Sequence, residues 1–457
     1  MKSRMITLLL AIILLFSACS TGGGGENDSP KENDHIVLEI PAFTPEFEGR
    51  EYTITMIKKL ASRYTDEGKG MVEIREVATN EEIDGSAVDV IMLDTRLTQI
   101  RPNVYQDMVN GHYVSLTDMM EKDKSYKPEN YVQGVMAAGA LGSEQYVIPL
   151  TYILPTVFGD EEISKNYGGP IKDDLANYEE FWEKVETMEL PLFAQKVFNT
   201  KMIHDATFVM SAGNYPNVVA ISDGTQEESY LRALAVYQKE AKNVTAFESF
   251  ENTQATTIED VVSEKSVLLY KNLGGGFGYL DCLVNNAKTT KDSIKDMFSV
   301  SLETNPNMFY GSIPYTPGQT EEVRTAYVNT GLAVSAKSEK QDAAWNFISW
   351  CLRQTDLFKT YETQYYAFPV HKSMVTEVLF EGFEELKLTY GEEYLKWMSS
   401  IDIADEVTDI GYAYMLDRVA GEAVKQAMAQ DTSALTVEQL DQNIRDLYAE
   451  GEKIVTQ

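Results

Sequence analysis

The sequence predicts an α/β protein with more than one domain, and three observations lead to this prediction. In the first third, short apolar runs rich in β-branched residues alternate with segments of helical periodicity. This alternation is typical of a largely parallel sheet flanked by helices. The last third has helical periodicity almost throughout. The chain has 457 residues, more than the ~250–300 at which a single hydrophobic core stops growing, so two domains are expected.

The N-terminus has the features of an export signal. Lys2 and Arg4 precede the apolar run Ile6–Phe16, and small residues stand before Cys19, which is the arrangement of a secretory signal. The run is about a dozen residues, shorter than the roughly 20 that cross a bilayer. Residues 1–18 resemble a bacterial lipoprotein signal peptide, in which case Cys19 carries the lipid, with palmitate or a similar acyl chain. The alternative is an ordinary secretory signal with an incidental cysteine.

A flexible tether is expected at residues 19–35. The segment after the cysteine reads STGGGGENDSPKEND, which is polar and rich in glycine and therefore behaves as a flexible coil. With a lipid at Cys19, the protein would be anchored to the cell membrane on its extracytoplasmic face without crossing it.

Strands and helices are expected to alternate in the first third. Residues 88–93, VDVIML, form a continuous apolar run like that of a strand buried on both faces. Pro128 suits the first position of a helix. The expected strands are residues 36–40, 71–77, 88–93 and 146–150, and the expected helices are residues 51–64, 99–109, 116–122 and 128–140.

The remainder is predicted to be mainly helical with a few strands. Ser338 and Gln341 have the spacing of a capping box before an apolar stripe. The expected helices are residues 178–188, 201–212, 227–241, 343–352, 415–428 and 440–448, and the expected strands are residues 266–270, 308–313 and 331–335.

Charge and composition argue against several functions. The chain carries 71 acidic and 39 basic residues, a net charge of −32, and would be repelled by nucleic-acid phosphates. The four histidines show no zinc-ligand spacing, so no metal or other cofactor is expected. Cys282 and Cys351 could form a disulfide or stay as two buried thiols. No HExxH, GxSxG or SxxK motif is present, although chance pairs of carboxylates are unavoidable among so many acids.

Four segments together resemble one family. They are VDVIMLD at 88–94, HYVSLTDMMEKD at 112–123, QYVIPLTY at 145–152 and TGLAVSAKSEKQDAAWNFISWCLRQ at 330–354, followed by Phe368-Pro369-Val370. In type, order and spacing they resemble the extracellular solute-binding lipoproteins of ABC importers, in the carbohydrate-type group (family 1). Two places that commonly touch ligand in that family depart from its pattern: Ile40-Pro41-Ala42-Phe43 and Asn272–Gly278. These departures argue against a standard sugar as the ligand.

The resemblance implies a two-lobed periplasmic-binding-protein-like fold of type II. Each lobe would be a mainly parallel sheet flanked by helices and built from discontinuous segments. The N-terminal lobe would comprise 36–150 and 272–336, and the C-terminal lobe 151–271 and 337–457. Crossovers between the lobes are expected near Thr151–Leu154, Tyr270–Leu273 and Ala336–Ser338.

The resemblance also implies a function. The protein would be a monomer that captures a solute between its lobes, most simply an oligosaccharide or a glycoside. It would close around the solute by hinge bending, a motion known from periplasmic binding proteins. It would then deliver the solute to an ABC permease. Two alternatives stay open: a surface lipoprotein that degrades polysaccharide with two carboxylates, and a sensory subunit that presents its ligand to a receptor.

Candidate ligand-binding residues follow from the rule that ligands lie beyond the carboxyl ends of sheet strands. After the 88–93 strand the rule selects Asp94, Thr95 and Arg96, with a helix-capping role as the alternative for Asp94. At the first crossover it selects Thr151 and Tyr152, the latter alternatively a packing aromatic.

The second group of candidates lies in glycine-rich and aromatic segments. Asn272 and Gly275 would let the backbone approach a ligand, with Phe277 as an aromatic platform; a plain connector between lobes is the alternative. Tyr365 belongs to an aromatic cluster that could stack on a sugar ring.

Overall fold

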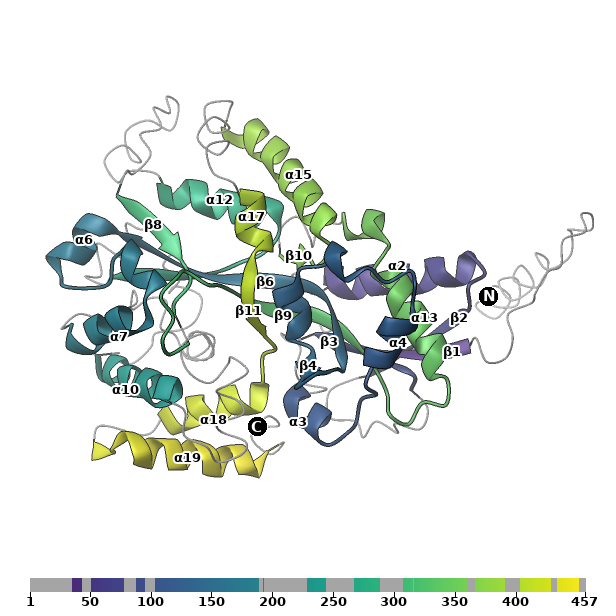
Figure 1. Ribbon diagram of the computed structural model, residues 1–457, viewed down its shortest axis with the longest axis horizontal. Helices are drawn as coiled ribbons and strands as arrows, with labels where there is room; N and C mark the ends of the chain where they lie inside the picture. The colour runs from purple at the N-terminus through teal and green to yellow at the C-terminus, as the bar shows by residue number, and fades with distance from the viewer. Residues whose placement is uncertain are drawn as a thin grey trace, which may run out of the picture.

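A computed structural model of the chain places one long mixed sheet across the molecule, with helices above and below it (Figure 1). No helix in the described part of the chain is long and apolar enough to cross a membrane. The signal, Cys19 and residues 20–34 of the tether lie outside the described residues, whereas His35, the last residue of the predicted tether, is the first residue of a strand. The structure describes residues 35–42, 51–77, 88–94, 103–188, 192, 228–243, 267–287, 307–314, 316–359, 366–390, 403–428 and 434–451.

In the described part of the chain the main sheet has nine strands. Its central path runs in the order β10-β6-β9-β3-β1-β2, and β11 pairs with β9 while β7 and β8 pair with β6. The strands are β1 (His35–Pro41), β2 (Met71–Val77), β3 (Val90–Asp94), β6 (Val147–Asp160), β7 (Leu268–Leu273), β8 (Met308–Gly311), β9 (Arg324–Val334), β10 (Phe368–Pro369) and β11 (Ile410–Tyr414); β4 (Ala140–Leu141) and β5 (Glu144–Gln145) form a separate hairpin.

The prediction of mainly parallel sheets is wrong in part. β1 pairs in parallel with β2 and β3, and β11 with β9. The pairs that involve β6, and the pair of β3 with β9, are antiparallel. The reason is that β6 and β9 run in opposite directions through the middle of the sheet, so that neither needs a helical crossover to lie beside the other.

β6 and β9 are unusually long and each changes partners along its length. β6 pairs with β9 as far as Ile153, and beyond it with β7 and β8. β9 pairs with β11 up to Tyr327 and with β3 from Thr330. The two strands therefore connect the β1–β3 side of the sheet to the β7–β8 side. β6 changes partners inside the predicted range Thr151–Leu154, whereas β9 does so well before Ala336–Ser338.

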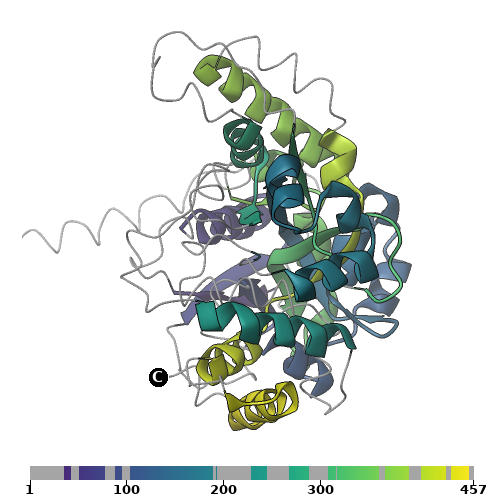
Figure 2. The same cartoon turned by 90° about the vertical axis from the view of Figure 1, so that its left-hand side faces the viewer.

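Helices cover both faces of the sheet. Above it in Figure 1 lie α12 (Gly276–Ala287), α15 (Lys372–Tyr390) and α17 (Ile403–Thr408). Figure 2 shows a layer of three helices at the opposite side: α10 (Glu228–Asn243), α18 (Arg418–Met428) and α19 (Val437–Glu450). Both α10 and α18 contact α19. Buried apolar residues from nearly all of these elements form one large core.

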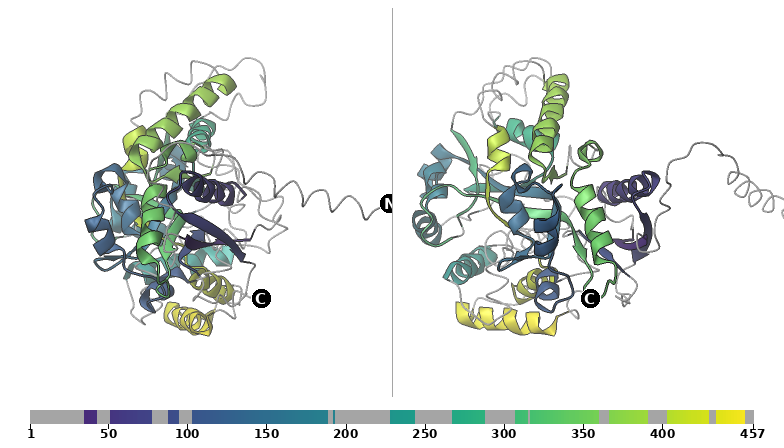
Figure 3. Two further views of the ribbon diagram at one scale, coloured as in Figure 1. Left: turned by 90° about the vertical axis from the view of Figure 1, so that its right-hand side faces the viewer. Right: turned by 45° about the vertical axis from the view of Figure 1, so that its right-hand side comes forward.

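The predicted lobe boundaries remain a prediction, and one helix packs differently from that assignment. α13 (Gln341–Cys351), placed in the C-terminal lobe by the sequence, contacts α2 (Glu51–Asp66), β1 and β9. Tyr64 on α2 meets Phe347 and Trp350 on α13 edge to face, with ring centroids 5.2 Å apart in both pairs. The views in Figure 3 show these two helices side by side.

Two local predictions were wrong. Residues 128–140 do not form one helix: a 3₁₀ turn, η3 (Pro128–Asn130), is followed by the short helix α5 (Gln133–Ala137) and then β4. Ser338 is not the N-cap of α13, because its hydroxyl donates to Asp89 and accepts from the Lys340 amide instead. The predicted helix 201–212 lies outside the described residues. The shorter helices are α3 (Val104–Val109), α4 (Thr117–Lys122), α6 (Glu161–Asn166) and α7 (Tyr178–Thr187).

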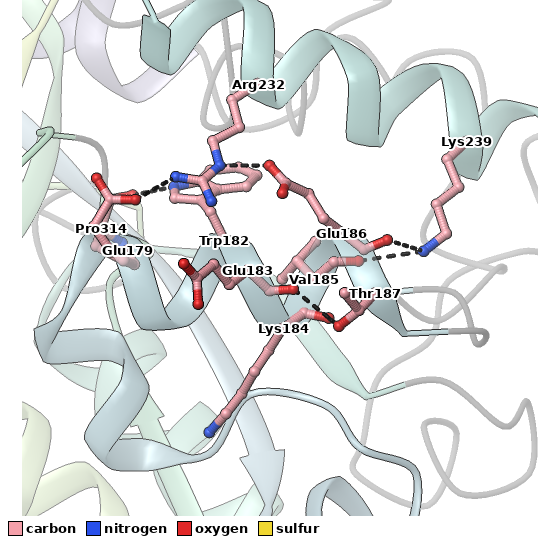
Figure 4. A network of polar contacts seen from close by, with 10 residues as sticks. All are labelled: Glu179, Trp182, Glu183, Lys184, Val185, Glu186, Thr187, Arg232, Lys239 and Pro314. Carbon is pink, nitrogen blue, oxygen red and sulfur yellow. Dashed lines mark hydrogen bonds and ion pairs between the residues drawn. The ribbon is translucent and has the colours of Figure 1, made fainter.

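α10 is fastened to α7 by two basic side chains (Figure 4). The Arg232 guanidinium donates to Glu179 (2.7 Å) and to Glu186 (2.5 Å), and Lys239 donates to carbonyl groups at the end of α7, including that of Val185 at 3.3 Å. The Arg232 side chain is only 13% exposed. Its planar fork therefore joins two carboxylates from a largely buried position.

Replacing this arginine tests the fastening. We expect Arg232→Lys to lower the free energy of unfolding by about 1 kcal/mol, because a single ammonium cannot hold two carboxylates with the guanidinium's planar geometry. Denaturant titration measures the change. Lys165→Met is the control: it removes an exposed ion pair with Glu161 and should cost less than about 0.5 kcal/mol. Equal effects of the two substitutions would contradict the prediction.

Candidate functional site

A row of residues crosses four strands where β6 and β9 change partners. Asp94 is the last residue of β3 and faces Thr330 of β9. Thr330 faces Thr151 of β6, which in turn faces Pro369 of β10. We call these four residues the crossover row. Its three polar members are buried, Asp94 being 4% exposed and the two threonines 0%. Polar side chains buried in this way must find partners inside the protein.

Asn329 supplies such partners beside the row. Its side-chain amide nitrogen lies 3.2 Å from Oγ1 of Thr151 and 3.3 Å from Oγ1 of Thr330, positioned to donate to both hydroxyls. Asn329 is itself fully buried. The apolar strand β9 thus contains a polar pair, Asn329-Thr330, in the middle of the sheet.

Asp94, Thr95 and Arg96 have different outcomes. Asp94 lies at the carboxyl end of β3, as the strand-end rule requires, and joins the crossover row. Thr95 and Arg96 lie outside the described residues, and so does Tyr365. Thr151 is at the crossover but its hydroxyl is bonded to Asn329. The structure therefore brings Asp94 and Thr151 into one row, separated by Thr330.

Tyr152 occupies the position of a packing residue. It is fully buried, and its hydroxyl donates to the Val407 carbonyl at 2.6 Å. Its ring lies against Phe368, with centroids 5.7 Å apart, and Tyr279 of α12 also meets that phenylalanine, edge to face. Burial raises the pKa of Tyr152 well above its ordinary value. The hydroxyl and the ring of Tyr152 are both engaged within the protein, and its contact with ligand stays a prediction.

The glycine run after β7 has a packing role that the sequence did not suggest. A Cβ added to Gly274 would lie 1.9 Å from the Tyr366 carbonyl oxygen, and one added to Gly276 would lie 2.1 Å from that of Val378. Gly275 has a left-handed backbone, φ +66°, which favours glycine. Gly274 and Gly276 allow neighbouring protein backbone to approach closely, and contact of Gly275 with ligand stays a prediction. Asn272 is exposed at the end of β7, and Phe277 packs partly buried against the core.

A charged cluster lies on the β7–β8 side of the sheet. The Glu406 carboxylate of α17 accepts hydrogen bonds from Tyr310 (2.8 and 3.0 Å) and Tyr279 (3.3 Å), and Arg324 lies 3.6 Å from it. Burial, with the Glu406 charge adding to it, raises the pKa of Tyr310 above its ordinary value. These contacts tie α17 to β8, β9 and α12, and they were not predicted from the sequence because their members are far apart in the chain.

Metal and thiol chemistry have little support in the described part of the chain. No group of three or more His, Cys, Asp or Glu side chains there is placed to hold a metal ion. Cys282 and Cys351 are not paired. Burial raises the pKa of the Cys282 thiol to about 12, which keeps it protonated and unreactive near neutral pH.

A pocket of about 470 Å³ lies away from the crossover row. It is formed where α4 and the turn after it approach the β4–β5 hairpin, next to the start of β6. Its lining includes Thr117, Met120, Asp123, Tyr126, Lys127 and Gln145. None of the residues predicted to bind ligand lines it.

The comparisons with known proteins define the class of this protein. Residues 59–384 match the profile of the bacterial extracellular solute-binding proteins, family 8. The chain belongs to this family of solute-binding proteins, so the class of protein expected from the sequence motifs is confirmed, while the matching model is that of family 8 and not of the expected family 1. The members of the family are non-enzymatic receptors, which agrees with the prediction that the chain is not an enzyme. No curated protein matches the sequence.

Solved structures show the same fold. The bacterial solute receptor AcbH is similar with a TM-score of 0.52 and 10% sequence identity, covering 92% of this chain and 98% of the receptor. A sugar transporter protein from Rhizobium etli in an open conformation has a TM-score of 0.50 at 14% identity, covering 91% and 99% of the two chains. The α/β fold of periplasmic binding proteins, with mixed sheets and helices, is therefore confirmed.

Proposed function

We propose that this protein is the receptor subunit of an ABC importer, and that it captures an oligosaccharide or glycoside between two lobes. The observation that carries the proposal is the family match over residues 59–384, taken with the two long strands that join the sides of the sheet. β6 and β9 provide a short connection about which two lobes of type II could turn. Hinge closure on the solute would then create the shape that a permease recognises.

A carbohydrate is the ligand class that we favour. The AcbH receptor has an exclusive preference for β-D-galactopyranose, and the Rhizobium etli protein is a sugar transporter. The buried carboxylate of Asp94, at a strand end beside the crossover, has the acceptor chemistry that sugar hydroxyls require. Attachment through Cys19, with residues 19–35 as a tether, would keep the receptor at the outer face of the membrane.

A thermal-shift screen tests the ligand class. We expect at least one mono- or oligosaccharide in a broad panel to raise the melting temperature, since a ligand at 100 times its Kd stabilises the folded state by about 2.7 kcal/mol. Asp94→Asn keeps the size of the side chain but removes its charge, and should abolish most of that shift. The measurement is the melting curve with and without saturating ligand.

Asp89→Asn is the matched control. Asp89 is a buried aspartate just before the opposite end of β3, and it accepts from the Val37 amide at 2.9 Å. We expect this variant to melt lower yet keep the full ligand-induced shift. Equal shifts in all three proteins would remove Asp94 from the site. A panel with no shift at all would contradict the carbohydrate assignment, and release of product would contradict binding without reaction.

A further inference from the structure

The side chains of Asn329 and Thr151 join β9 to β6 at the point where both strands change partners, and we call this pair the hinge pin. We propose that this pair, rather than a ligand contact, sets how far the two sides of the sheet can turn about β6 and β9; the inference rests on the proposed function, in which such turning captures solute. Asn329 and Thr151 are thus positioning residues.

The backbone pairing of β6 with β9 is irregular only around Thr151. Residues 147–149 face 333–331, and residues 152–153 face 328–327, in one continuous register. Thr151 alone is displaced to face Thr330, with a register shift on each side of it. The regular register between the two connecting strands is therefore interrupted where they change partners.

Side chains take over at this irregularity. The Asn329 amide reaches both threonine hydroxyls, at 3.2 and 3.3 Å. A hydroxyl can rotate about its C–O bond and so keep its hydrogen bond while the strands shift slightly, whereas a backbone ladder has a fixed geometry. The pair can thus join β6 to β9 and still permit a small turn.

Burial makes these hydrogen bonds difficult to replace. Asn329, Thr151 and Thr330 are all fully buried, so water cannot take the place of a lost partner. An amide left without a partner in such surroundings carries its full desolvation cost. Flanking positions of the same strands, such as Ile148 and Leu332, are apolar and also fully buried, and they offer no donor or acceptor from their side chains.

The experiment measures the distance between the two sides directly. Spin labels at Lys122→Cys on α4 and Lys165→Cys on α6 would report it by pulsed electron resonance, in full-length protein with Cys19 and Cys282 changed to serine. Both lysines are well exposed, and α4 and α6 lie on opposite sides of the sheet (Figure 1). No ligand is required.

Thr151→Val, which removes the hydroxyl at nearly constant volume, is expected to widen the distribution of distances. Thr151→Ser keeps a hydroxyl and should restore the narrow distribution. Thr156→Val is the matched control, because Thr156 is a buried threonine of the same strand whose hydroxyl donates to the nearby Leu154 carbonyl of β6 itself, at 3.4 Å. It should lower the melting temperature without widening the distribution.

An unchanged distribution in Thr151→Val would overturn the proposal and leave the pair as a stabilising contact. Asn329→Ser, whose side chain is too short to reach Thr151, gives the same test from the other partner if the valine variant does not fold. Because the distances are measured without ligand, a failed carbohydrate screen would contradict the proposed function and not the hinge pin. An unchanged distance distribution would contradict the hinge pin and not the proposed function.

Discussion

Gly276→Ala should strongly destabilise the protein. Gly276 is the first residue of α12, and an added Cβ would lie 2.1 Å from the carbonyl oxygen and 2.7 Å from the carbonyl carbon of Val378 on α15. Backbone atoms cannot rotate away as a side chain can, so the two helices would have to separate. We expect a loss of about 3 kcal/mol or more in the free energy of unfolding, measured by denaturant titration.

Two further Gly→Ala variants provide a comparison for the loss of stability at Gly276. Gly382 lies on the other side of the same helix crossing, where an added Cβ would be 2.7 Å from atoms of Gly276 and Phe277; Gly382→Ala should be costly but less so. Gly68→Ala is the control, because the space around Gly68 is open and only its left-handed backbone, φ +68°, resists the change. That conformation costs about 1–2 kcal/mol. A loss at Gly276 no greater than at Gly68 would show that the helices do not touch through their backbones.

The second large effect concerns the buried carboxylate of Asp417. Asp417 precedes α18 and caps it, since Oδ1 accepts from the Ala420 amide at 2.9 Å. Asp417 is 2% exposed, and its Oδ2 atom has no hydrogen-bond partner in the described structure. Burial raises the pKa of Asp417 from the usual 3.8 to about 7, against the lowering effect of the capping bonds. The nearby charge of Asp107 also raises it.

The raised pKa predicts an unusual dependence of stability on pH. Between about pH 4 and pH 7 the folded protein holds the Asp417 proton that the unfolded chain has released, so folding binds a proton there. The contribution of Asp417 is therefore most favourable below pH 4 and is lost as the pH rises to about 7. Each unit of pKa difference corresponds to about 1.4 kcal/mol, which gives up to about 4 kcal/mol in total.

Asp417→Asn should remove this dependence. The amide oxygen can still cap α18, while the side chain stays neutral at every pH, so the variant should gain stability over the wild type as the pH rises from 4 to 7. Denaturant titrations at a series of pH values measure the difference. Asp417→Ser, another capping side chain without a carboxyl group, should show the same gain. Parallel curves for wild type and both variants would contradict the assignment.

Much of the fold could be predicted from patterns within short segments. The continuous apolar run 88–93 became β3, and the apolar stripes before Cys351 and Tyr448 became α13 and α19. These elements bury one or both of their faces, and burial leaves a periodic signal in the sequence. The family could be inferred for the same reason, because its motifs are local. Asp94 was selected by its position directly after a buried strand.

The rest of the candidate site could not be derived in this way. The pairing of Asp94 with Thr330, and of Thr330 with Thr151, depends on which strands become neighbours. The only signal for Asn329 and Thr330 was a polar pair inside the apolar stretch 326–334. The sequence predicts that the segment of Asn272 and Gly275 approaches a ligand or connects the lobes, but it does not predict that Gly274 and Gly276 face other backbone segments.

The sequence by itself determined the class of protein and the type of most elements, because both depend on residues near one another in the chain. The sequence also determined the net charge of −32, which opposes binding to nucleic acids. Only the tertiary structure decided the mixed direction of the strands, the packing role of Tyr152 and the clustering of Asn329 with two threonines. These features depend on contacts between segments more than a hundred residues apart, and the periodicity of a single segment carries no information about its distant partners.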